Sequence, residues 1–249
     1  MKDCKLYTVD CLDLDPAIVD KCKLLYIDPP YGPKTMDSYF GIGKTIDEYI
    51  EWLDKRLRHI TSQMSNYNVV VHVDPKCGHY VKVAMDQIFG LKNFKNEIIW
   101  CYSGPSVCKS HFPRKHDLLY WYGVGDNVFN VQRIPYKSLS NAKGSPWGGI
   151  SEEKRQKMLE RGKMVEDFWT DIPALVRNEK EKRGYKTQKP KKLLDRIVSG
   201  MSNEGDLVVD PMVGSGTTML SALNLKRKFI GIDNCKNAIS MCEKAAKSI

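Results

Sequence analysis

The sequence has no long hydrophobic run. No stretch of its 249 residues reaches the roughly 20 consecutive apolar residues that a membrane-spanning helix needs. The first six residues, Met1-Lys2-Asp3-Cys4-Lys5-Leu6, also lack the apolar core of a signal peptide. We therefore expect a cytoplasmic protein that is neither embedded in a membrane nor exported.

Paired metal-ligating residues are also missing. None of the eight cysteines forms a C-x-x-C pair, and no histidine stands at zinc-finger spacing. Several cysteines lie within apolar stretches, as Cys101 does after Ile98-Ile99-Trp100, where a reduced thiol packs as a small hydrophobic group. The sequence therefore predicts no metal site, and reduced cysteines in a reducing compartment.

Two common phosphate-binding patterns are absent as well: the three-glycine dinucleotide pattern and the Gly-Lys-Ser/Thr phosphate loop. The charge is biased, because 39 basic and 30 acidic residues give a net charge of +9. Between positions 177 and 192, eight Lys and Arg stand against two Glu. This excess favours a polyanionic partner, although a solvated charged face would have the same composition.

Strand and helix patterns alternate along the chain. Apolar runs predict strands over residues 4–10, 24–27, 68–73, 97–102, 117–122, 206–209 and 228–232. Amphipathic spacing predicts helices over residues 46–64, 78–89, 151–164 and 217–225, another after Pro190, and a last one near the C-terminus. This alternation predicts an α/β protein with a doubly wound sheet. One domain (residues 1–122 and 187–249) would carry an inserted segment (residues 123–186).

Two of the predicted strands end on a carboxylate. Asp28 follows the strand at 24–27, and Asp210 follows the strand at 206–209 and leads into a glycine turn at 212–218. In open α/β sheets, ligands bind outside the carboxyl ends of strands, near the point where the strand order reverses. The sequence therefore predicts one site that holds two ligands.

The glycine turn and a third carboxylate indicate the first ligand. Gly214 and Gly216 would let the backbone pass close to a ligand. Asp233, at the end of the next strand, is placed to accept hydrogen bonds from ribose hydroxyls. Asp210 would repel a pyrophosphate but pair with an ammonium group. A nucleoside with an amino-acid tail suits both carboxylates, which favours S-adenosylmethionine as the cofactor.

The first strand end indicates the second ligand. Asp28 and a proline carbonyl can accept both hydrogens of an exocyclic amino group, and Tyr31 can stack on a flat ring. These features suit a nucleobase, which must leave a duplex to enter such a pocket. Hydrogen bonds to the amine would aim its lone pair at the methyl group, so transfer depends on positioning and electrostatics. Removal of the surplus proton by Asp28 or by water stays open.

These residues resemble the motifs of DNA methyltransferases that modify amino groups. Residues 28–31 resemble the catalytic motif, and residues 210–218 resemble the cofactor motif, with Met212 where an aromatic residue is more usual. The catalytic motif comes first, an order similar to that of the beta group. The resemblance implies a seven-stranded, Rossmann-like methyltransferase sheet in which the strands ending at Asp28 and Asp210 are neighbours.

The resemblance also assigns roles to residues. It places Asp10 and Cys11 in a loop that touches the cofactor adenine, and Lys189 of Thr187-Gln188-Lys189-Pro190 near the methionine carboxylate. The implied catalytic residues are Asp28, Pro29, Pro30 and Tyr31. The implied cofactor-binding residues are Asp10, Cys11, Lys189, Asp210, Pro211, Met212, Gly214, Ser215, Gly216, Thr217, Thr218 and Asp233.

By resemblance, DNA is the partner, and the inserted segment recognises the target. The basic candidates for DNA contacts are Lys109, His111, Arg114, Lys115, Arg133, Lys137, Lys143, Lys154, Arg155, Arg177, Lys182, Arg183 and Lys186. Most of them would bind phosphates rather than bases. His72 is interpreted as structural, and His116-Asp117 resembles a family position near the substrate pocket without an assigned role. A homodimer and an association with the nucleoid are further expectations.

Several alternatives remain at this point. By resemblance, an aspartate in the first motif position favours adenine N6 over cytosine N4. An RNA substrate is a further alternative, because nothing in the basic segment separates RNA from DNA. A nucleic-acid-binding protein without catalysis is the last one, and the intact carboxylates Asp28, Asp210 and Asp233 argue against it.

Overall fold

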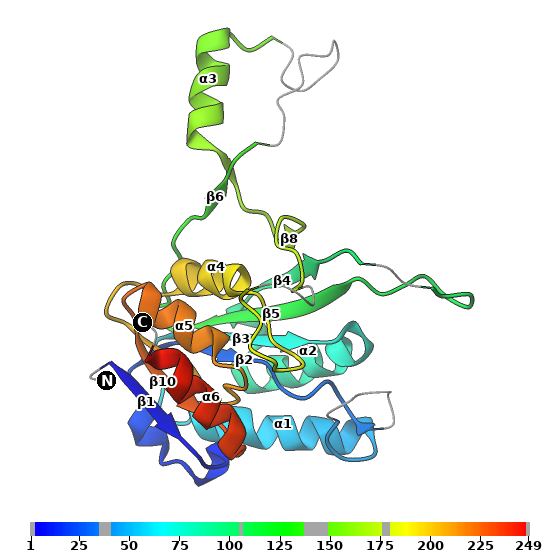
Figure 1. The fold of residues 1–249 in the computed structure, drawn as a ribbon, viewed down its shortest axis with the longest axis vertical. Helices are drawn as coiled ribbons and strands as arrows, with labels where there is room; N and C mark the ends of the chain where they lie inside the picture. Colours follow the sequence, from blue (N-terminus) through cyan, green and yellow to red (C-terminus); the bar gives the residue numbers. More distant parts are fainter. Residues whose placement is uncertain (1–2, 35–40, 105–106, 137–148, 176–179, 248–249) are drawn as a thin grey trace. The chain divides into compact units, whose positions relative to one another are not determined.

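The chain forms two compact units. The computed structural model describes residues 3–34, 41–104, 107–136, 149–175 and 180–247. The first unit comprises residues 1–129 and 167–249, and the second comprises residues 130–166 (Figure 1). No helix among the described residues is both long and apolar enough to span a membrane.

The described residues of the first unit form an eight-stranded sheet in the order β1-β10-β9-β2-β3-β5-β4-β8. Neighbouring strands are parallel, except that β5 runs antiparallel to both β3 and β4. The strands are β1 (Cys4–Tyr7), β2 (Cys22–Ile27), β3 (Tyr67–Val73), β4 (Phe94–Cys101), β5 (His116–Val124), β8 (Phe168–Trp169), β9 (Leu207–Asp210) and β10 (Lys228–Ile232).

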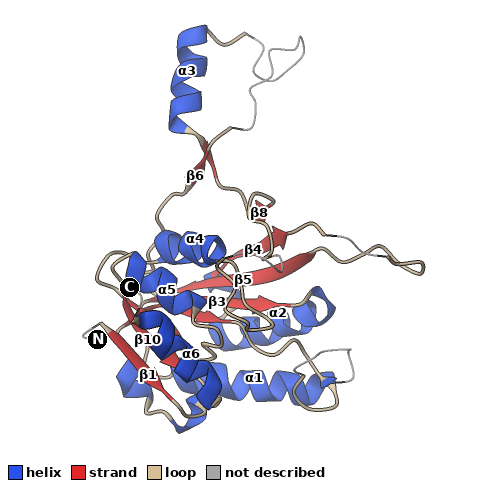
Figure 2. Cartoon of the chain, in the orientation of Figure 1, coloured by secondary structure: helices blue, strands red, loops and turns tan. Residues whose placement is uncertain are grey.

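Helices cover the sheet (Figure 2). They are α1 (Ile46–Thr61), α2 (Pro75–Phe89), α4 (Lys191–Met201), α5 (Thr217–Asn224) and α6 (Lys236–Ala246), with short 3-10 helices η1 (Cys11–Asp13), η2 (Pro16–Val19) and η4 (Leu91–Asn93). Leu25 and Ile27 of β2 belong to one buried cluster with Leu53 of α1. Leu24 and Tyr26 are equally buried but fall outside that cluster, because successive side chains of a strand point to opposite faces. The sheet is therefore buried on both faces, as a doubly wound fold requires.

The predicted adjacency of the two carboxylate-bearing strands is confirmed. β2 and β9 pair in parallel, with Leu25 opposite Val209. The chain proceeds from β2 to β3 on one side, whereas it proceeds from β9 to β10 on the other. Asp28 and Asp210 therefore lie at the same edge of the sheet, at its topological switch point.

The fold class is confirmed, but the expected count of seven strands is one too few. The added strand, β8, contains only two residues and pairs with β4 through Ile99 and Phe168. Such a short strand has no periodicity that a sequence pattern can detect. Trp100 Nε1 donates a hydrogen bond of 2.8 Å to the carbonyl of Ile172, which fixes the segment after β8 against β4.

Helix ends differ from the predicted ones because side chains cap them. α2 begins at Pro75 rather than at residue 78, since Asp74 accepts a 2.7 Å hydrogen bond from Lys76 N and proline suits a first helical position. α1 begins with a capping box between Thr45 and Glu48, and it ends at Thr61, three residues before the predicted end.

The second unit contains β6 (Arg133–Ile134) paired with β7 (Lys163–Met164), and α3 (Glu152–Arg161). It lies within the predicted insertion of residues 123–186, whose two ends belong to the first unit. The helix predicted over residues 151–164 is shorter, because Gly162 at φ 71° ends it. Residues 137–148, which include most of a predicted turn, lie outside the described residues.

We predict that Asn68→Leu destabilises the first unit. Asn68 is fully buried, accepts a 2.8 Å hydrogen bond from Trp121 Nε1, and donates one of 2.9 Å to the carbonyl of Met201. With leucine at this position, Trp121 Nε1 and the carbonyl of Met201 stay buried but lose their hydrogen bonds to the Asn68 side chain. The free energy of unfolding should therefore fall by about 2–4 kcal/mol. Urea unfolding followed by circular dichroism measures the change. Asn237→Ala, at an exposed position of α6, is the matched control, and equal stabilities of the two variants would contradict this account.

Candidate active site

A cavity of about 550 Å³ opens at the sheet edge where β2 and β9 end. Its lining includes predicted residues of both halves of the site: Asp10, Cys11, Asp28, Pro29, Pro30, Tyr31, Pro211, Met212 and Asp233. A smaller cavity of about 60 Å³ is lined by Lys189, Asp210, Gly214, Ser215, Thr217 and Thr218, and it shares Asp28 and Met212 with the larger one. Of the predicted site residues, Gly216 alone is not among the residues that line these two cavities. The structure therefore brings the two predicted halves together.

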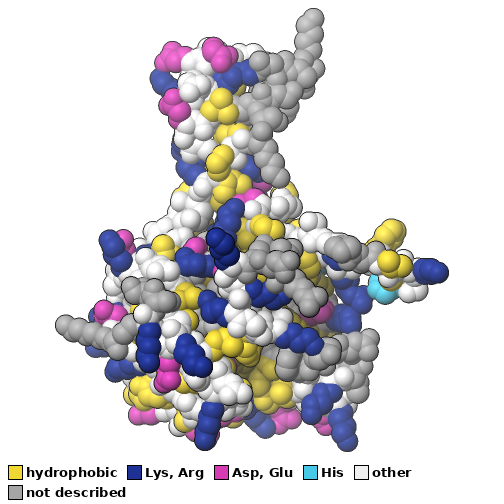
Figure 3. Space-filling view, in the orientation of Figure 1, with side chains coloured by type: hydrophobic (Ala, Val, Ile, Leu, Met, Phe, Trp, Pro, Cys, Tyr) yellow, Lys and Arg dark blue, Asp and Glu magenta, His cyan; other side chains and the backbone are white. Residues whose placement is uncertain are grey.

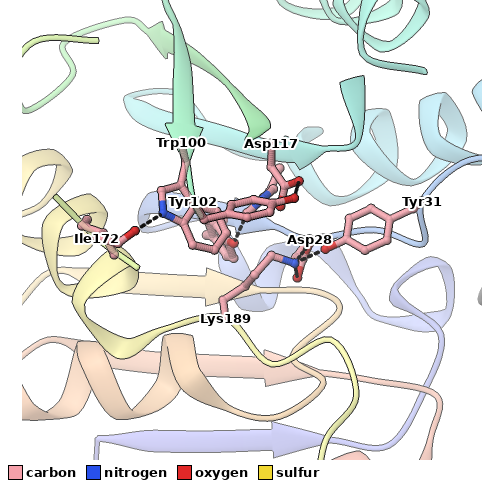
Figure 4. A network of polar contacts seen from close by, with 9 residues as sticks. Asp28, Tyr31, Trp100, Tyr102, Asp117, Ile172 and Lys189 are labelled. Atoms are coloured by element: carbon pink, nitrogen blue, oxygen red, sulfur yellow. Dashed lines mark hydrogen bonds and ion pairs between the residues drawn. The ribbon is translucent and has the colours of Figure 1, made fainter. Parts of the chain in front are cut away.

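Lys189 lies at the centre of the catalytic motif (Figure 4). Its Nζ donates hydrogen bonds of 2.9 and 2.7 Å to the two carboxylate oxygens of Asp28, and a further one to the hydroxyl of Tyr31. Burial, the largest single influence, lowers the pKa of this lysine, but the charge and hydrogen bonds of Asp28, together with Tyr31 and Asp117, outweigh burial and raise the pKa above its usual value. Lys189 is therefore a permanent cation that orients both Asp28 and Tyr31.

A buried polar network lies behind this ion pair (Figure 4). His72 Nδ1 hydrogen-bonds the hydroxyl of Tyr26 at 2.9 Å, and His72 Nε2 contacts Asp117 at 2.9 Å. Tyr102 donates a 3.0 Å hydrogen bond to the other oxygen of Asp117. Burial tends to raise the pKa of Asp117, but His72 and Lys189 lower it overall, so Asp117 is a second anion near Lys189. The resemblance placed Asp117 near the substrate pocket, but sequence reasoning did not find its contacts with His72 and Tyr102.

The glycine turn after β9 is shaped by contacts within the protein. Gly214 and Gly216 have φ angles of 48° and 75°, which favour glycine. A Cβ on Gly216 would lie 2.7 Å from Cys242 Sγ, and one on Gly214 would lie 3.1 Å from the ring of Tyr185. Both glycines are therefore required by the fold itself, whatever ligand the turn holds.

Asp233 connects this turn to the cavity. Its carboxylate accepts hydrogen bonds of 2.9 Å from Gly214 N and 2.8 Å from Cys235 N. Since a carboxylate has about four lone-pair sites, these two bonds leave it able to accept further hydrogen bonds from the cavity it lines. Asp233 is thus rigidly placed to bind hydroxyl groups.

Asp10, which also lines the larger cavity, is held by two contacts. One oxygen accepts a 3.0 Å hydrogen bond from Leu12 N, and the other lies 2.5 Å from the guanidinium of Arg56. Arg56 in turn stacks 4.2 Å from the ring centre of Trp52, another residue of the cavity lining. Sequence reasoning missed Arg56 and Trp52, because they lie on α1 outside its apolar stripe.

Asp210 is the most deeply buried carboxylate of the site, with 2% of its surface exposed. Burial raises its pKa to about 7, and hydrogen bonds from Thr218 and from Met212 N oppose this rise. The bond from Met212 N is 3.0 Å long. A carboxylate held in this way gains from a cationic ligand, because such a ligand stabilises its ionised form.

Arg183 has a different place from the one predicted. Its guanidinium donates hydrogen bonds of 2.9 Å to the carbonyl of Ser215 and 3.1 Å to the hydroxyl of Thr217. This predicted DNA contact therefore supports the glycine turn in the structure. Three other predicted DNA contacts, Lys137, Lys143 and Arg177, lie outside the described residues.

The site suits a nucleoside that carries an ammonium group. The larger cavity is within the range of roughly 300–1,000 Å³ that small-molecule sites have. It presents Asp10 and Asp233 as hydrogen-bond acceptors, and the adjoining smaller cavity presents Asp210. Among the described residues, no three His, Cys, Asp or Glu side chains cluster as metal ligands would. The donor set therefore fits S-adenosylmethionine.

Comparisons with known proteins agree with this geometry. A family model described as DNA methylase matches residues 22–244. The chain belongs to this family. It is 32% identical over 250 residues to the type II methyltransferase M.BamHI of Bacillus amyloliquefaciens, covering 93% of this chain and 55% of that protein. The chain thus spans about half the length of M.BamHI. It is 30% identical to the DNA adenine methyltransferase YhdJ of Escherichia coli (strain K12), covering 92% of this chain and 77% of YhdJ.

Solved structures confirm the Rossmann-like methyltransferase fold. The M1.HpyAVI complex with S-adenosylmethionine superimposes with a TM-score of 0.64 at 20% identity, covering 98% of both chains. The cytosine-N4-specific PvuII DNA methyltransferase has a TM-score of 0.67 at 15% identity, covering 97% of this chain and 85% of that chain. Adenine-specific and cytosine-specific enzymes thus both occur among the similar proteins.

We predict strong energetic coupling between Lys189 and Asp28. A double-mutant cycle with Lys189→Met and Asp28→Asn should give a coupling energy of about 1–3 kcal/mol in urea unfolding. The exposed pair Lys55 and Glu51, 2.6 Å apart, is the control and should give only about 0.3–0.5 kcal/mol. Coupling no larger than that of the control would show that the central ion pair does not hold the motif together.

Proposed function

We propose that the chain transfers a methyl group from S-adenosylmethionine to the N6 amino group of adenine in DNA. The observation that carries the proposal is the shared cavity, whose lining includes Asp28 and Tyr31 together with Asp233 and Asp10. Membership of the DNA methylase family supports the reaction class. A homodimer, an association with the nucleoid, and target recognition by residues 123–186 stay predictions.

The cofactor half would hold S-adenosylmethionine, which supplies an electrophilic methyl group when bound. We assign Asp233 to the ribose hydroxyls, because its carboxylate is fixed by Gly214 N and Cys235 N and lines the cavity. We assign Asp10 and Cys11 to the adenine end, and Asp210 to the ammonium group. We assign Lys189, which lines the smaller cavity together with Asp210, to the methionine carboxylate through its charge, because its three hydrogen bonds go to Asp28 and Tyr31.

The substrate half would hold an extruded base. Asp28 and a proline carbonyl accept the two amino hydrogens, and Tyr31 stacks on the ring in place of the neighbouring bases of the duplex. Lys189 already bonds both oxygens of Asp28, but each oxygen has a second lone pair for the amine. The chain thereby holds the amine in place before the reaction, which lowers the activation barrier because less freedom of movement is lost in the transition state.

Lys189 also bears on the loss of the proton. Methylation leaves positive charge on the amine, and a cation held on the same carboxylate opposes that charge. The surplus proton must therefore leave, either to Asp28 or to water. The repulsion favours loss to water, whereas transfer to Asp28 would also cost the ion pair that this carboxylate makes with Lys189.

Adenine is the favoured base, and cytosine N4 is the second candidate. YhdJ, which is named as an adenine methyltransferase, is 30% identical and supports adenine. The PvuII enzyme, named as cytosine-N4-specific, has the same fold and keeps cytosine in consideration. Both bases present an exocyclic amino group that Asp28 can bind. RNA methylation and binding without catalysis have no specific observation in their favour.

We predict that a host expressing the chain gains N6-methyladenine at one sequence motif, and that Asp28→Ala prevents it. Loss of the acceptor removes the group that orients the amine, so the transfer rate should fall by about 10²–10³-fold or more. Modification-sensitive sequencing of host DNA measures base and motif together. N4-methylcytosine instead would establish the alternative, and unmodified DNA would contradict the proposal.

Cofactor binding provides the control for this variant. Asp28→Ala should bind S-adenosylmethionine with a near-normal dissociation constant in isothermal titration calorimetry, whereas Asp233→Ala should bind it weakly. The opposite pattern would exchange the two assigned roles.

We further predict that cofactor affinity rises with pH. The pKa of Asp210 is about 7, so its carboxyl group is mostly protonated at pH 6 and mostly ionised at pH 7.5. Because the ionised form pairs with an ammonium group, the association constant should increase about five- to tenfold over this interval. Calorimetry at each pH measures it. Asp210→Asn should remove the dependence, and a wild-type affinity that does not change with pH would reassign the ammonium contact.

A further inference from the structure

The described residues 102–104 and 107–115 form a projecting arm that leaves the sheet beside the active site. It connects β4 to β5, and Tyr102 N donates a 3.0 Å hydrogen bond to the carbonyl of Lys115 at its base (Figure 1). β4 runs in the same direction as β2 and β3, because β5 is antiparallel to both β3 and β4. The arm therefore projects from the same sheet edge at which Asp28 lies.

The tip of the arm exposes large apolar side chains. Val107 is 94% exposed and Phe112 is 95% exposed, the highest values among the exposed large hydrophobic residues of the described chain. Two contacts of His111 Nδ1, 3.0 Å to Ser110 Oγ and 3.3 Å to Cys108 Sγ, give the tip a defined local turn. Phe112 follows this turn directly and lies at its surface.

Basic side chains lie next to the apolar side chains of the arm (Figure 3). The arm carries Lys109, Arg114 and Lys115, and the sequence has no Asp or Glu between residues 98 and 116. Water does not stabilise an exposed aromatic ring, and an acidic surface would pair with the basic residues of the arm but leave the ring without a partner. The arm suits DNA, in which phosphates surround an apolar stack of bases.

We propose that Phe112 is a wedge that inserts into the base stack of bound DNA, while Lys109, Arg114 and Lys115 contact the phosphates. The proposal rests on the DNA substrate of the proposed function. A base that leaves the duplex for the cavity breaks its stacking with the neighbouring bases, and an apolar side chain inserted at that step restores part of it. Phe112 would thereby lower the free energy of extruding the target base.

The base of the arm is connected to the active site. Tyr102, the first arm residue, donates a hydrogen bond to Asp117, and Asp117 acts electrostatically on Lys189. The arm thus begins at a residue held by the buried network next to Asp28, and it ends two residues before Asp117 of the same network. The start of the wedge-bearing arm is therefore connected to the pocket that receives the nucleobase.

A binding experiment tests the wedge without methyl transfer. The full chain is titrated against a short fluorescent duplex, fully paired or with one abasic site. We expect wild type to bind the abasic duplex about tenfold more tightly, because its stack is already open to an aromatic side chain. F112A should lose this preference, and F112W should keep it. K109A should weaken binding to both duplexes equally, since a phosphate contact does not sense the stack.

Two outcomes would overturn the proposal: no preference in wild type, or an unchanged preference in F112A, whether or not F112A binds both duplexes more weakly. A change in the sedimentation of free F112A, with its DNA preference intact, would assign Phe112 to contact with a second copy of the chain. Because the assay needs no catalysis, a chain that shows the preference but modifies no host DNA would contradict the proposed function and leave the wedge supported.

Discussion

Two carboxylates at adjacent strand ends impose the constraint on which the site depends. β2 and β9 pair in parallel, so Asp28 and Asp210 face the same edge in a partly dry environment. The chain compensates Asp28 with the ammonium group of Lys189. Asp210 has no such cation, and burial raises its pKa to about 7 although Thr218 and Met212 N donate hydrogen bonds that lower it. One carboxylate is satisfied internally and keeps its geometry, whereas the other is suited to an external cation.

Local patterns predicted much of this arrangement. An apolar run that ends on a carboxylate marks a strand end, and parallel strand ends share one edge, so Asp28, Asp210 and Asp233 could be placed from the sequence. The contact between Lys189 and Asp28 joins residues 161 positions apart, and no periodicity encodes it. The contact between His72 and Asp117 was not predicted for the same reason, although the resemblance placed Asp117 near the substrate pocket. It depends on the antiparallel register of β3 and β5, which only the fold establishes.

The two glycines of the turn after β9 were correctly singled out from the sequence, but only one of the two reasons for them was predicted. Glycine at 214 and 216 suggested close approach to a ligand, but the contacts with Tyr185 and Cys242 show that the protein itself needs the space. The two requirements are compatible, because the same turn presents Gly214 N to Asp233. The packing that requires glycine therefore also positions Gly214 N, which holds the Asp233 carboxylate in the site.

The position of Lys189 constrains how the reaction ends as well as how it begins. A buried ammonium on Asp28 raises the free energy of any state in which the neighbouring amine also carries positive charge. Asp117, close behind, offsets part of this repulsion through its own negative charge. With these two charges in place, the neutral amine can bind to Asp28. The methylated amine is disfavoured as long as it carries a positive charge, until it loses a proton. A single lysine placed between two carboxylates therefore holds the acceptor in place and makes deprotonation of the product favourable.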